Sequence, residues 1–295
     1  MSLPAIPTAM RIAMWMGLSA IGFGCLMGVV RHLGQDLHVF VISFWRFVFG
    51  FLMFAPWFYR MGPASLKSQR FGLHVLRACF LIASSVALMT AILLMPLDEA
   101  TALSFITPIL SVIGAVVFLR ERAGPRRWIA IAIGFIGILI ILRPGMEIIN
   151  IAAFLVLFSA ITFAGVIVTG KVLVRYDSPE MVVAYLALIC VPLSFIPALF
   201  FWQWPEPTDY LWLIAAAVFS NMNMYGIARA LKIGDASATQ PYDFLRLPTT
   251  AGVGWIAFGE TSDIYTWIGA AVIFSSTIYI THREALAKRR EAAAT

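Results

Sequence analysis

Residues 95–121 read MPLDEATALSFITPILSVIGAVVFLRE, and residues 233–260 read IGDASATQPYDFLRLPTTAGVGWIAFGE. Both stretches run from an acidic turn through a mixed helix with an internal proline to an apolar segment that ends in glutamate. A short loop and a helix beginning with Trp-Ile follow each copy, at Trp128 and at Trp267, so the copies lie 139 residues apart. The chain is therefore predicted to consist of two related halves.

The composition around these copies places the chain in a membrane. Hydrophobic residues make up 61% of the 295 residues and charged residues only 12%, whereas a soluble domain carries about 25% charged residues. A helix that crosses a hydrocarbon core of roughly 30 Å needs about 20 mostly apolar residues. Ten such spans are predicted, at residues 11–30, 38–58, 72–94, 98–119, 127–142, 149–170, 180–202, 210–230, 236–258 and 263–281.

The basic residues predict the orientation of these spans. If the N-terminus is cytoplasmic, seventeen of the 21 Lys and Arg residues fall inside, as the positive-inside rule requires. Arg31 and Arg143 fall outside, and Arg46 and Arg246 fall within the bilayer. The seventeen are Arg11, Arg60, Lys67, Arg70, Arg77, Arg120, Arg122, Arg126, Arg127, Lys171, Arg175, Arg229, Lys232, Arg283, Lys288, Arg289 and Arg290. We therefore expect a multi-pass protein of the bacterial inner membrane with both termini in the cytoplasm.

The predicted topology also gives the relative orientation of the two halves in the membrane. The copies lie in the fourth and ninth spans, and this odd offset of five helices places Glu121 inside and Glu260 outside, so the halves are inverted. The predicted fold class is an all-α integral membrane protein whose ten transmembrane helices form two inverted five-helix repeats. The repeats cover residues 1–145 and 146–282, and a basic cytoplasmic tail covers 283–295. Inverted repeats are typical of secondary transporters, whose substrate site lies at the midplane between the halves. The alternative is that apolar helices resemble one another through composition alone.

The chain lacks the residues that several other classes of function require. No GxxxxGK[ST] phosphate loop occurs, which argues against an ATP-driven pump in this chain. The three cysteines form no CxxC or Cys/His cluster, so no disulfide, metal or other cofactor is indicated. An intramembrane enzyme would need clustered His or carboxylate groups, but Asp243 is the only acid expected at mid-membrane. The sequence pI near 9.5 follows from the topology and does not call for a nucleic-acid partner.

Three charged residues are the first candidates for a binding site. Arg46 lies near the middle of span 38–58, and Asp243 and Arg246 share a face near the middle of span 236–258. A charge at this depth costs roughly 2.5–3.5 kcal/mol, which makes it a functional candidate by default. The set carries a formal net charge of +1, so we expect an anionic group of a substrate, or a helix C-terminus, to complete it. The alternative is a structural pin between the two spans, which is the favoured interpretation for the Asp243–Arg246 pair.

Aromatic and amide side chains form a second group of candidates. Five rings lie deep enough to stack on a ring or a cation, although core packing is the favoured interpretation for each taken singly: Trp15, Trp45, Tyr185, Tyr225 and Tyr242. Asn221 and Asn223 are two residues apart on one helix, so only one of them can face a ligand, and Asn221 is the candidate chosen here. Gly24 and Gly28 predict close helix packing.

Arg77 lies near the start of span 72–94, one turn after His74. Long basic side chains at the end of a membrane helix extend to the lipid headgroups. We therefore expect Arg77 to reach the cytoplasmic surface, with a gate at the inner mouth as the alternative.

The chain as a whole resembles the ten-helix EamA-type carriers of the drug/metabolite transporter superfamily. The resemblance rests on FWRF at Phe44–Phe47, on LDEATALSFITPI through FLRER in span 98–119, and on RWIAIAIGFIGILIILRPG at 127–145. It implies a cavity lined by helices 1–4 and 6–9, with helices 5 and 10 at the periphery. Within the family, DASATQPYDFLRL, LHVFVISFWRF and HVLR are most similar to S-adenosylmethionine uptake carriers.

The expected function is thus the secondary transport of a small charged metabolite, with S-adenosylmethionine uptake first. Riboflavin, amino-acid or drug transport by the same superfamily is the alternative. The expected partners are the metabolite and membrane lipid, and the oligomeric state stays open.

Overall fold

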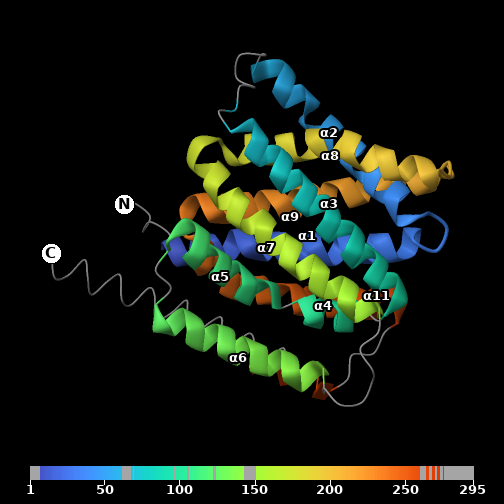
Figure 1. Cartoon of the computed structure of the whole chain (residues 1–295). Coiled ribbons are helices and arrows are strands. Elements are labelled where there is room, and N and C mark those ends of the chain that lie inside the picture. The colour runs from blue at the N-terminus through green and yellow to red at the C-terminus, as the bar shows by residue number, and fades with distance from the viewer. Residues whose placement is uncertain are drawn as a thin grey trace, which may run out of the picture.

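The computed structural model describes residues 7–61, 68, 70–95, 97–104, 106–121, 124–142 and 151–259, together with some positions between 264 and 275. Every element in this part of the chain is helical (Figure 1). The elements are α1 (Thr8–Leu33), α2 (Val39–Met61), α3 (Phe71–Leu94), α4 (Leu97–Ser104), α5 (Ile106–Leu119), α6 (Pro125–Leu142), α7 (Ile151–Tyr176), α8 (Pro179–Phe200), α9 (Asp209–Ile233), α10 (Ala236–Thr239), η2 (Gln240–Leu245) and α11 (Arg246–Phe258).

Six of these helices are long and apolar enough to cross a membrane: α1, α2, α3, α7, α8 and α9. The expected span 98–119 is described as α4 and α5, on either side of residue 105, and α6 covers span 127–142. Span 263–281 lies largely outside the described residues. The structure therefore shows a multi-pass helical membrane protein, while the full number of ten helices stays a prediction.

Span 236–258 differs from the single helix that we expected. It begins with the short helix α10, continues as the 3₁₀ helix η2, and becomes a regular α-helix only at α11. Two prolines explain the change, because proline has no backbone N–H to donate. Pro241 occupies the first turn of η2, where no donor is needed. Pro248 cannot donate to the carbonyl of Phe244, so the regular hydrogen bonding of α11 does not extend back to Phe244, and this helix begins at Arg246.

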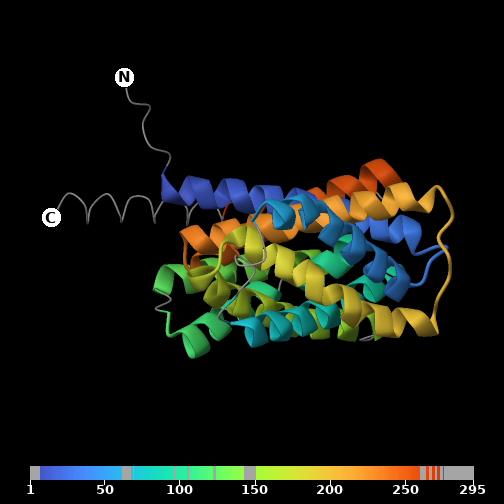
Figure 2. The same cartoon turned by 90° about the horizontal axis from the view of Figure 1, so that it is seen from above.

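The helices form a bundle with two distinct ends. We call the end at which α1, α3 and α8 begin the proximal end, and the opposite end the distal end; the proximal end is on the left of Figure 1. Helix α1 packs against α9 and α11, and α3 packs against α7 and α8. In Figure 2, α1 and α11 lie along one side of the bundle and α3 along the opposite side. Helix α2 contacts both α8 and α9 and so joins the two sides.

Glycines allow α1 to approach its neighbours at backbone distance. A Cβ atom on Gly24 would lie 3.0 Å from the backbone of Thr249, and one on Gly28 would lie 2.5 Å from Val253. The expected close packing at these two glycines is confirmed. Among the described glycines, the closest approach to a backbone atom is at Gly226 of α9, where a Cβ atom would lie 2.5 Å from the carbonyl oxygen of Trp15.

We expect Gly226→Ala to lower the free energy of unfolding by roughly 1–3 kcal/mol, because the backbone of α1 must move away from the added methyl group. Thermal unfolding of detergent-purified protein measures this effect. Gly17→Ala is the matched control, since nothing lies within 4 Å of a Cβ atom at that position. Equal melting temperatures for the two variants would show that α1 and α9 are not in backbone contact.

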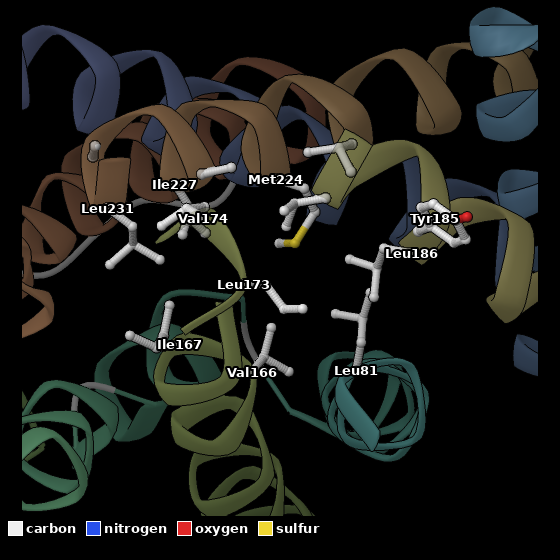
Figure 3. Close-up of a cluster of buried hydrophobic side chains, with 14 of the residues drawn as sticks. Leu81, Val166, Ile167, Leu173, Val174, Tyr185, Leu186, Met224, Ile227 and Leu231 are labelled. Carbon is white, nitrogen blue, oxygen red and sulfur yellow. The ribbon is translucent and has the colours of Figure 1, made fainter. Parts of the chain in front are cut away.

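Two apolar clusters fill the bundle. The proximal cluster is built from α3, α7, α8 and α9, whose side chains face a shared centre in Figure 3. The distal cluster joins the second half of α1 to the start of α2, the end of α3 and the start of α9. The site described next lies between these two clusters, and Leu81 and Met224 of the proximal cluster form part of its wall.

Candidate functional site

A polar cavity lies near the middle of the bundle, lined by residues from both halves of the chain. The space open to the centres of water molecules is about 50 Å³, which holds a few waters. Ligand pockets usually measure about 300–1,000 Å³, so the cavity must widen to admit a metabolite. Its polar lining consists of Arg46, Ser84, Ser85, Ser104, Thr107, Ser159, Ser220, Asn223 and Arg246.

Arg46 is 3% exposed and reaches the cavity from α2. Its guanidinium donates to Ser85 Oγ at 2.8 Å and to Ser220 Oγ at 3.1 Å, and it lies 4.3 Å from the centre of the Phe47 ring. No carboxylate of the described residues lies within ion-pair distance of Arg46, and its Nε has no hydrogen-bond partner there. The cavity therefore holds a full positive charge that only neutral groups solvate.

Arg246 reaches the cavity from the start of α11 and is already paired. Its Nε lies 3.0 Å from Asp243 Oδ1, close enough for an ion pair, although the N–H does not point at the oxygen. The guanidinium also lies against the rings of Phe23, at 4.6 Å, and Phe163, at 5.2 Å. The 3₁₀ turn of η2 brings Asp243 to Arg246, so the predicted pair forms. The charges of Arg46, Arg246 and Asp243 add up to a net charge of +1.

Hydroxyl and amide groups tie the cavity wall together in two similar places. Ser84 of α3 donates to the carbonyl oxygen of Ser159 on α7 at 3.0 Å, and their hydroxyls also lie 3.0 Å apart. Asn223 of α9 donates to the carbonyl oxygen of Ser19 on α1 at 2.9 Å and to its hydroxyl at 3.0 Å. Two matching polar contacts thus join the first half of the chain to the second.

The remaining candidates lie away from the cavity lining. The rings of Trp15 and Tyr225 meet edge to face at 5.7 Å near the proximal end. Arg229 lies over both rings, and it pairs with Glu180 at 2.7 Å. Trp15 and Tyr225 therefore surround a resident cation, Arg229, instead of an open site.

The other aromatic candidates belong to separate surroundings. Trp45 packs edge to face on Tyr210 toward the distal end, at 5.5 Å. Tyr185 stacks on His74 at 4.8 Å. Tyr242 is 2% exposed, and its hydroxyl donates to the carbonyl oxygen of Ala9. The structure thus brings only Arg46 and Arg246 of the candidates to the cavity, with Asp243 behind Arg246.

Only one of the two asparagines of α9 faces the cavity, as their two-residue spacing requires. Asn221 donates to the carbonyl oxygen of Gly50 on α2 at 3.0 Å and does not line the cavity. Asn223 lines the cavity instead. The spacing indicated that one amide would face the site, and the close contact of α9 with α1 determines which one.

Arg77 does not reach the headgroups, so that expectation is wrong. Its side chain is fully buried, and it donates to the carbonyl oxygens of Val166 on α7 and Val182 on α8, both at 3.3 Å. The packing of α3 against these two helices covers the path to the surface. Sequence reasoning could not find this contact, because its acceptors are backbone atoms about 90 and 105 residues away.

Aromatic rings cover the distal end, beside the connection between α1 and α2. His38 in this connection stacks on Phe201 with ring centres 4.0 Å apart and planes 5° apart. Burial lowers the pKa of His38 below its ordinary value, which favours a neutral ring at pH 7. This connection therefore packs through stacking of uncharged rings.

Six membrane-length helices define a multi-pass membrane protein, and five of them, α1, α2, α3, α7 and α9, contribute to the lining of the cavity. The chain belongs to the EamA-like transporter family, whose sequence profile matches residues 10–143 and 150–282. It is therefore a transmembrane transporter.

The chain is similar in sequence to several transporters of named cargo. A riboflavin transporter of Vibrio cholerae serotype O1 is 33% identical over 95% of both chains. A riboflavin transporter of Rhizobium johnstonii is 31% identical over 95% of this chain and 94% of its own. An S-adenosylmethionine uptake transporter of Rickettsia felis is 28% identical over 94% of both chains. A crystal structure with a TM-score of 0.75 and 19% identity covers 95% of this chain and 98% of its own, which shows a shared fold.

Proposed function

We propose that this transporter carries a planar, uncharged or anionic ring-bearing metabolite of the riboflavin type by alternating access. The observation that carries the proposal is the guanidinium of Arg46, which faces the cavity and forms no ion pair with a carboxylate of the described residues. A cargo rich in acceptor oxygens satisfies such a group, whereas a cation is repelled by it. The small cavity agrees with a conformation between two open states.

The helix packing supports two inverted repeats of five helices, with residues 1–145 and 146–282 as the repeats. The contact of α3 with α7 corresponds to that of α9 with α1, and the contact of α5 with α7 corresponds to that of α11 with α1. Ser84 and Asn223 are 139 residues apart, and Ser19 and Ser159 are 140 apart, close to the spacing of the sequence repeat. Inverted repeats of this kind exchange conformations during transport. This arrangement and the distribution of the basic residues support our proposal of ten helices in the inner membrane, with both termini in the cytoplasm.

The chemistry of the lining favours riboflavin. Riboflavin is uncharged near pH 7, and it has a planar ring system with two carbonyl groups and a chain of hydroxyls. The guanidinium and hydroxyl donors of the cavity match these acceptors, and the apolar side chains of Leu26, Leu81 and Leu88 line other parts of its wall. Two of the relatives described above are named as riboflavin transporters.

S-adenosylmethionine is the second candidate, because a relative named for its uptake is 28% identical to this chain and the DASATQPYDFLRL segment resembles such carriers. This molecule carries a sulfonium, an ammonium and a carboxylate group, with a net charge of +1, so its carboxylate could bind Arg46 but its two cationic groups need acidic partners. Among the described residues, Asp243 is the acid near the cavity, and it already forms an ion pair with Arg246. The net positive charge of the site therefore supports our choice of riboflavin ahead of S-adenosylmethionine.

Uptake into proteoliposomes tests the proposal. We expect labelled riboflavin to enter vesicles that contain the purified protein several times faster than protein-free vesicles, and excess unlabelled riboflavin to compete. Excess unlabelled S-adenosylmethionine should compete poorly, because the net positive cavity disfavours a cation. Fast uptake of labelled S-adenosylmethionine with no riboflavin uptake would reverse the assignment. Uptake of neither compound would reject both cargoes and leave the family membership intact.

A further inference from the structure

Arg77 lies on α3 between the cavity and the proximal end. It precedes Ser84 of the cavity lining by seven residues, which is roughly 10 Å along a helix. Its guanidinium is completely buried, and no carboxylate of the described residues forms an ion pair with it. An arginine cannot lose its charge at this position, and burial of an unpaired charge is costly. A position of this kind calls for an explanation beyond packing.

The contacts of Arg77 bridge the two halves of the chain. From α3 in the first half, it donates to the carbonyl oxygens of Val166 and Val182 in the second half. Gly170 makes room for it, since a Cβ atom there would lie 3.2 Å from Arg77 Nε. Both acceptors are carbonyl oxygens inside α7 and α8, and each already accepts a hydrogen bond within its own helix. Their hydrogen bonds to the guanidinium are therefore weak. Its Nη2 has no hydrogen-bond partner among the described residues.

A second polar contact lies one turn closer to the proximal end. His74 of α3 meets Asp177, in the connection between α7 and α8, at 2.8 Å, and both side chains are buried. Ser68 also donates to Asp177 at 2.8 Å. These bonds again run from the first half of the chain to the second. The proximal side of the cavity is therefore closed by polar bonds between the halves, in addition to the apolar cluster of Figure 3.

We propose that Arg77 is a positioning residue of the transport cycle: it holds the proximal half of the pathway closed by binding α7 and α8, and its release opens the cavity to the proximal side. The proposal rests on the proposed transport by alternating access. Weak bonds suit this role, because the bonds must break in every cycle. His74 and Asp177 support the closed state from the neighbouring turn.

Native Cys190 is a reporter for this opening. It is fully buried on α8, and its Sγ lies 3.9 Å from the carbonyl oxygen of Ala78, the residue after Arg77. Replacing Cys25 and Cys79 by alanine leaves Cys190 as the only thiol in the chain. Its labelling by a membrane-impermeant maleimide then measures access to the α3–α8 contact, and this measurement requires no cargo.

We expect Arg77→Met to raise the labelling rate of Cys190 about tenfold from one face of the membrane only, since bonds to a charged donor are lost. The two faces are compared in spheroplasts and in inverted vesicles. Arg77→Lys should label at an intermediate rate, because an ammonium can still bind one carbonyl. Asp177→Asn, a milder change, should raise the rate from the same face and provides the test if Arg77→Met does not fold.

Arg70→Met is the matched control. Arg70 lies at the same end of α3, but it is exposed, and among the described residues its guanidinium contacts Tyr176. The Arg70→Met variant should therefore leave the labelling rate of Cys190 unchanged. An unchanged rate in Arg77→Met and Asp177→Asn would overturn the proposal, and so would an equal increase from both faces, which indicates general loosening. Because labelling needs no cargo, a wrong cargo assignment leaves this test unaffected.

Discussion

Arg46→Ala is expected to reduce transport by roughly 100-fold while the protein remains folded. The guanidinium of Arg46 supplies the unpaired positive charge of the cavity and makes hydrogen bonds to Ser85 and Ser220. Each hydrogen bond from a charged donor contributes about 1.5–3 kcal/mol, so the loss of two such bonds to a cargo accounts for the expected factor. Uptake of labelled riboflavin into proteoliposomes measures the effect.

Arg46→Lys separates charge from geometry. It keeps the positive charge but loses the planar fork of donors, so transport should fall by a smaller factor than in Arg46→Ala. Ser220→Ala is the matched control, because it removes one neutral partner and leaves the guanidinium in place. A structural pin predicts a different pattern, in which Arg46→Ala melts at a lower temperature but binds riboflavin normally. Wild-type affinity in monodisperse Arg46→Ala would therefore rule out the ligand role.

Asp243→Ala is expected to have the largest effect on stability. Asp243 and Arg246 are 6% and 5% exposed, and the carboxylate lies 3.0 Å from the guanidinium. Removing one member of a buried ion pair leaves the other charge without compensation, which costs about 3–5 kcal/mol. The melting temperature and the yield of monodisperse protein in detergent should both fall sharply.

The double variant Asp243→Ala with Arg246→Met provides the control. Replacing a buried ion pair by apolar residues is often neutral for stability, so the double variant should recover most of the lost melting temperature. If the double variant is as unstable as Asp243→Ala, the loss comes from packing around η2 and not from the uncompensated charge. Transport by the recovered protein then reports whether Arg246 contacts the cargo.

The charged part of the site could be predicted from the sequence because charges are rare in membrane helices. Arg46, Asp243 and Arg246 stand out for this reason, and the three-residue spacing of Asp243 and Arg246 matches the ion pair that forms. The membrane class followed equally from composition. The break at η2 was harder to predict, because prolines such as Pro248 occur both in kinked helices and at true helix starts.

The rest of the site depended on contacts between distant segments. The charge of Arg77 and its place near a helix start suited a surface position, but its two acceptors are carbonyls of α7 and α8. Helical spacing separated Asn221 from Asn223 but could not say which would face the cavity. For Trp15 and Tyr225, depth in the membrane suggested a ligand, whereas the structure shows that Arg229 already lies over both rings. Pairwise contacts of this kind leave no local pattern.

The unpaired guanidinium of Arg46 has an electrical consequence for a carrier that alternates between two open states. The membrane voltage falls mainly across whichever half of the pathway is closed, so Arg46 lies on opposite sides of this voltage drop in the two states. A unit charge that experiences the full difference changes the energy of a state by about 2.3 kcal/mol per 100 mV. The empty protein should therefore rest in a voltage-dependent conformation and produce a transient current when the voltage is stepped. A monoanionic cargo bound beside Arg46 would cancel that current.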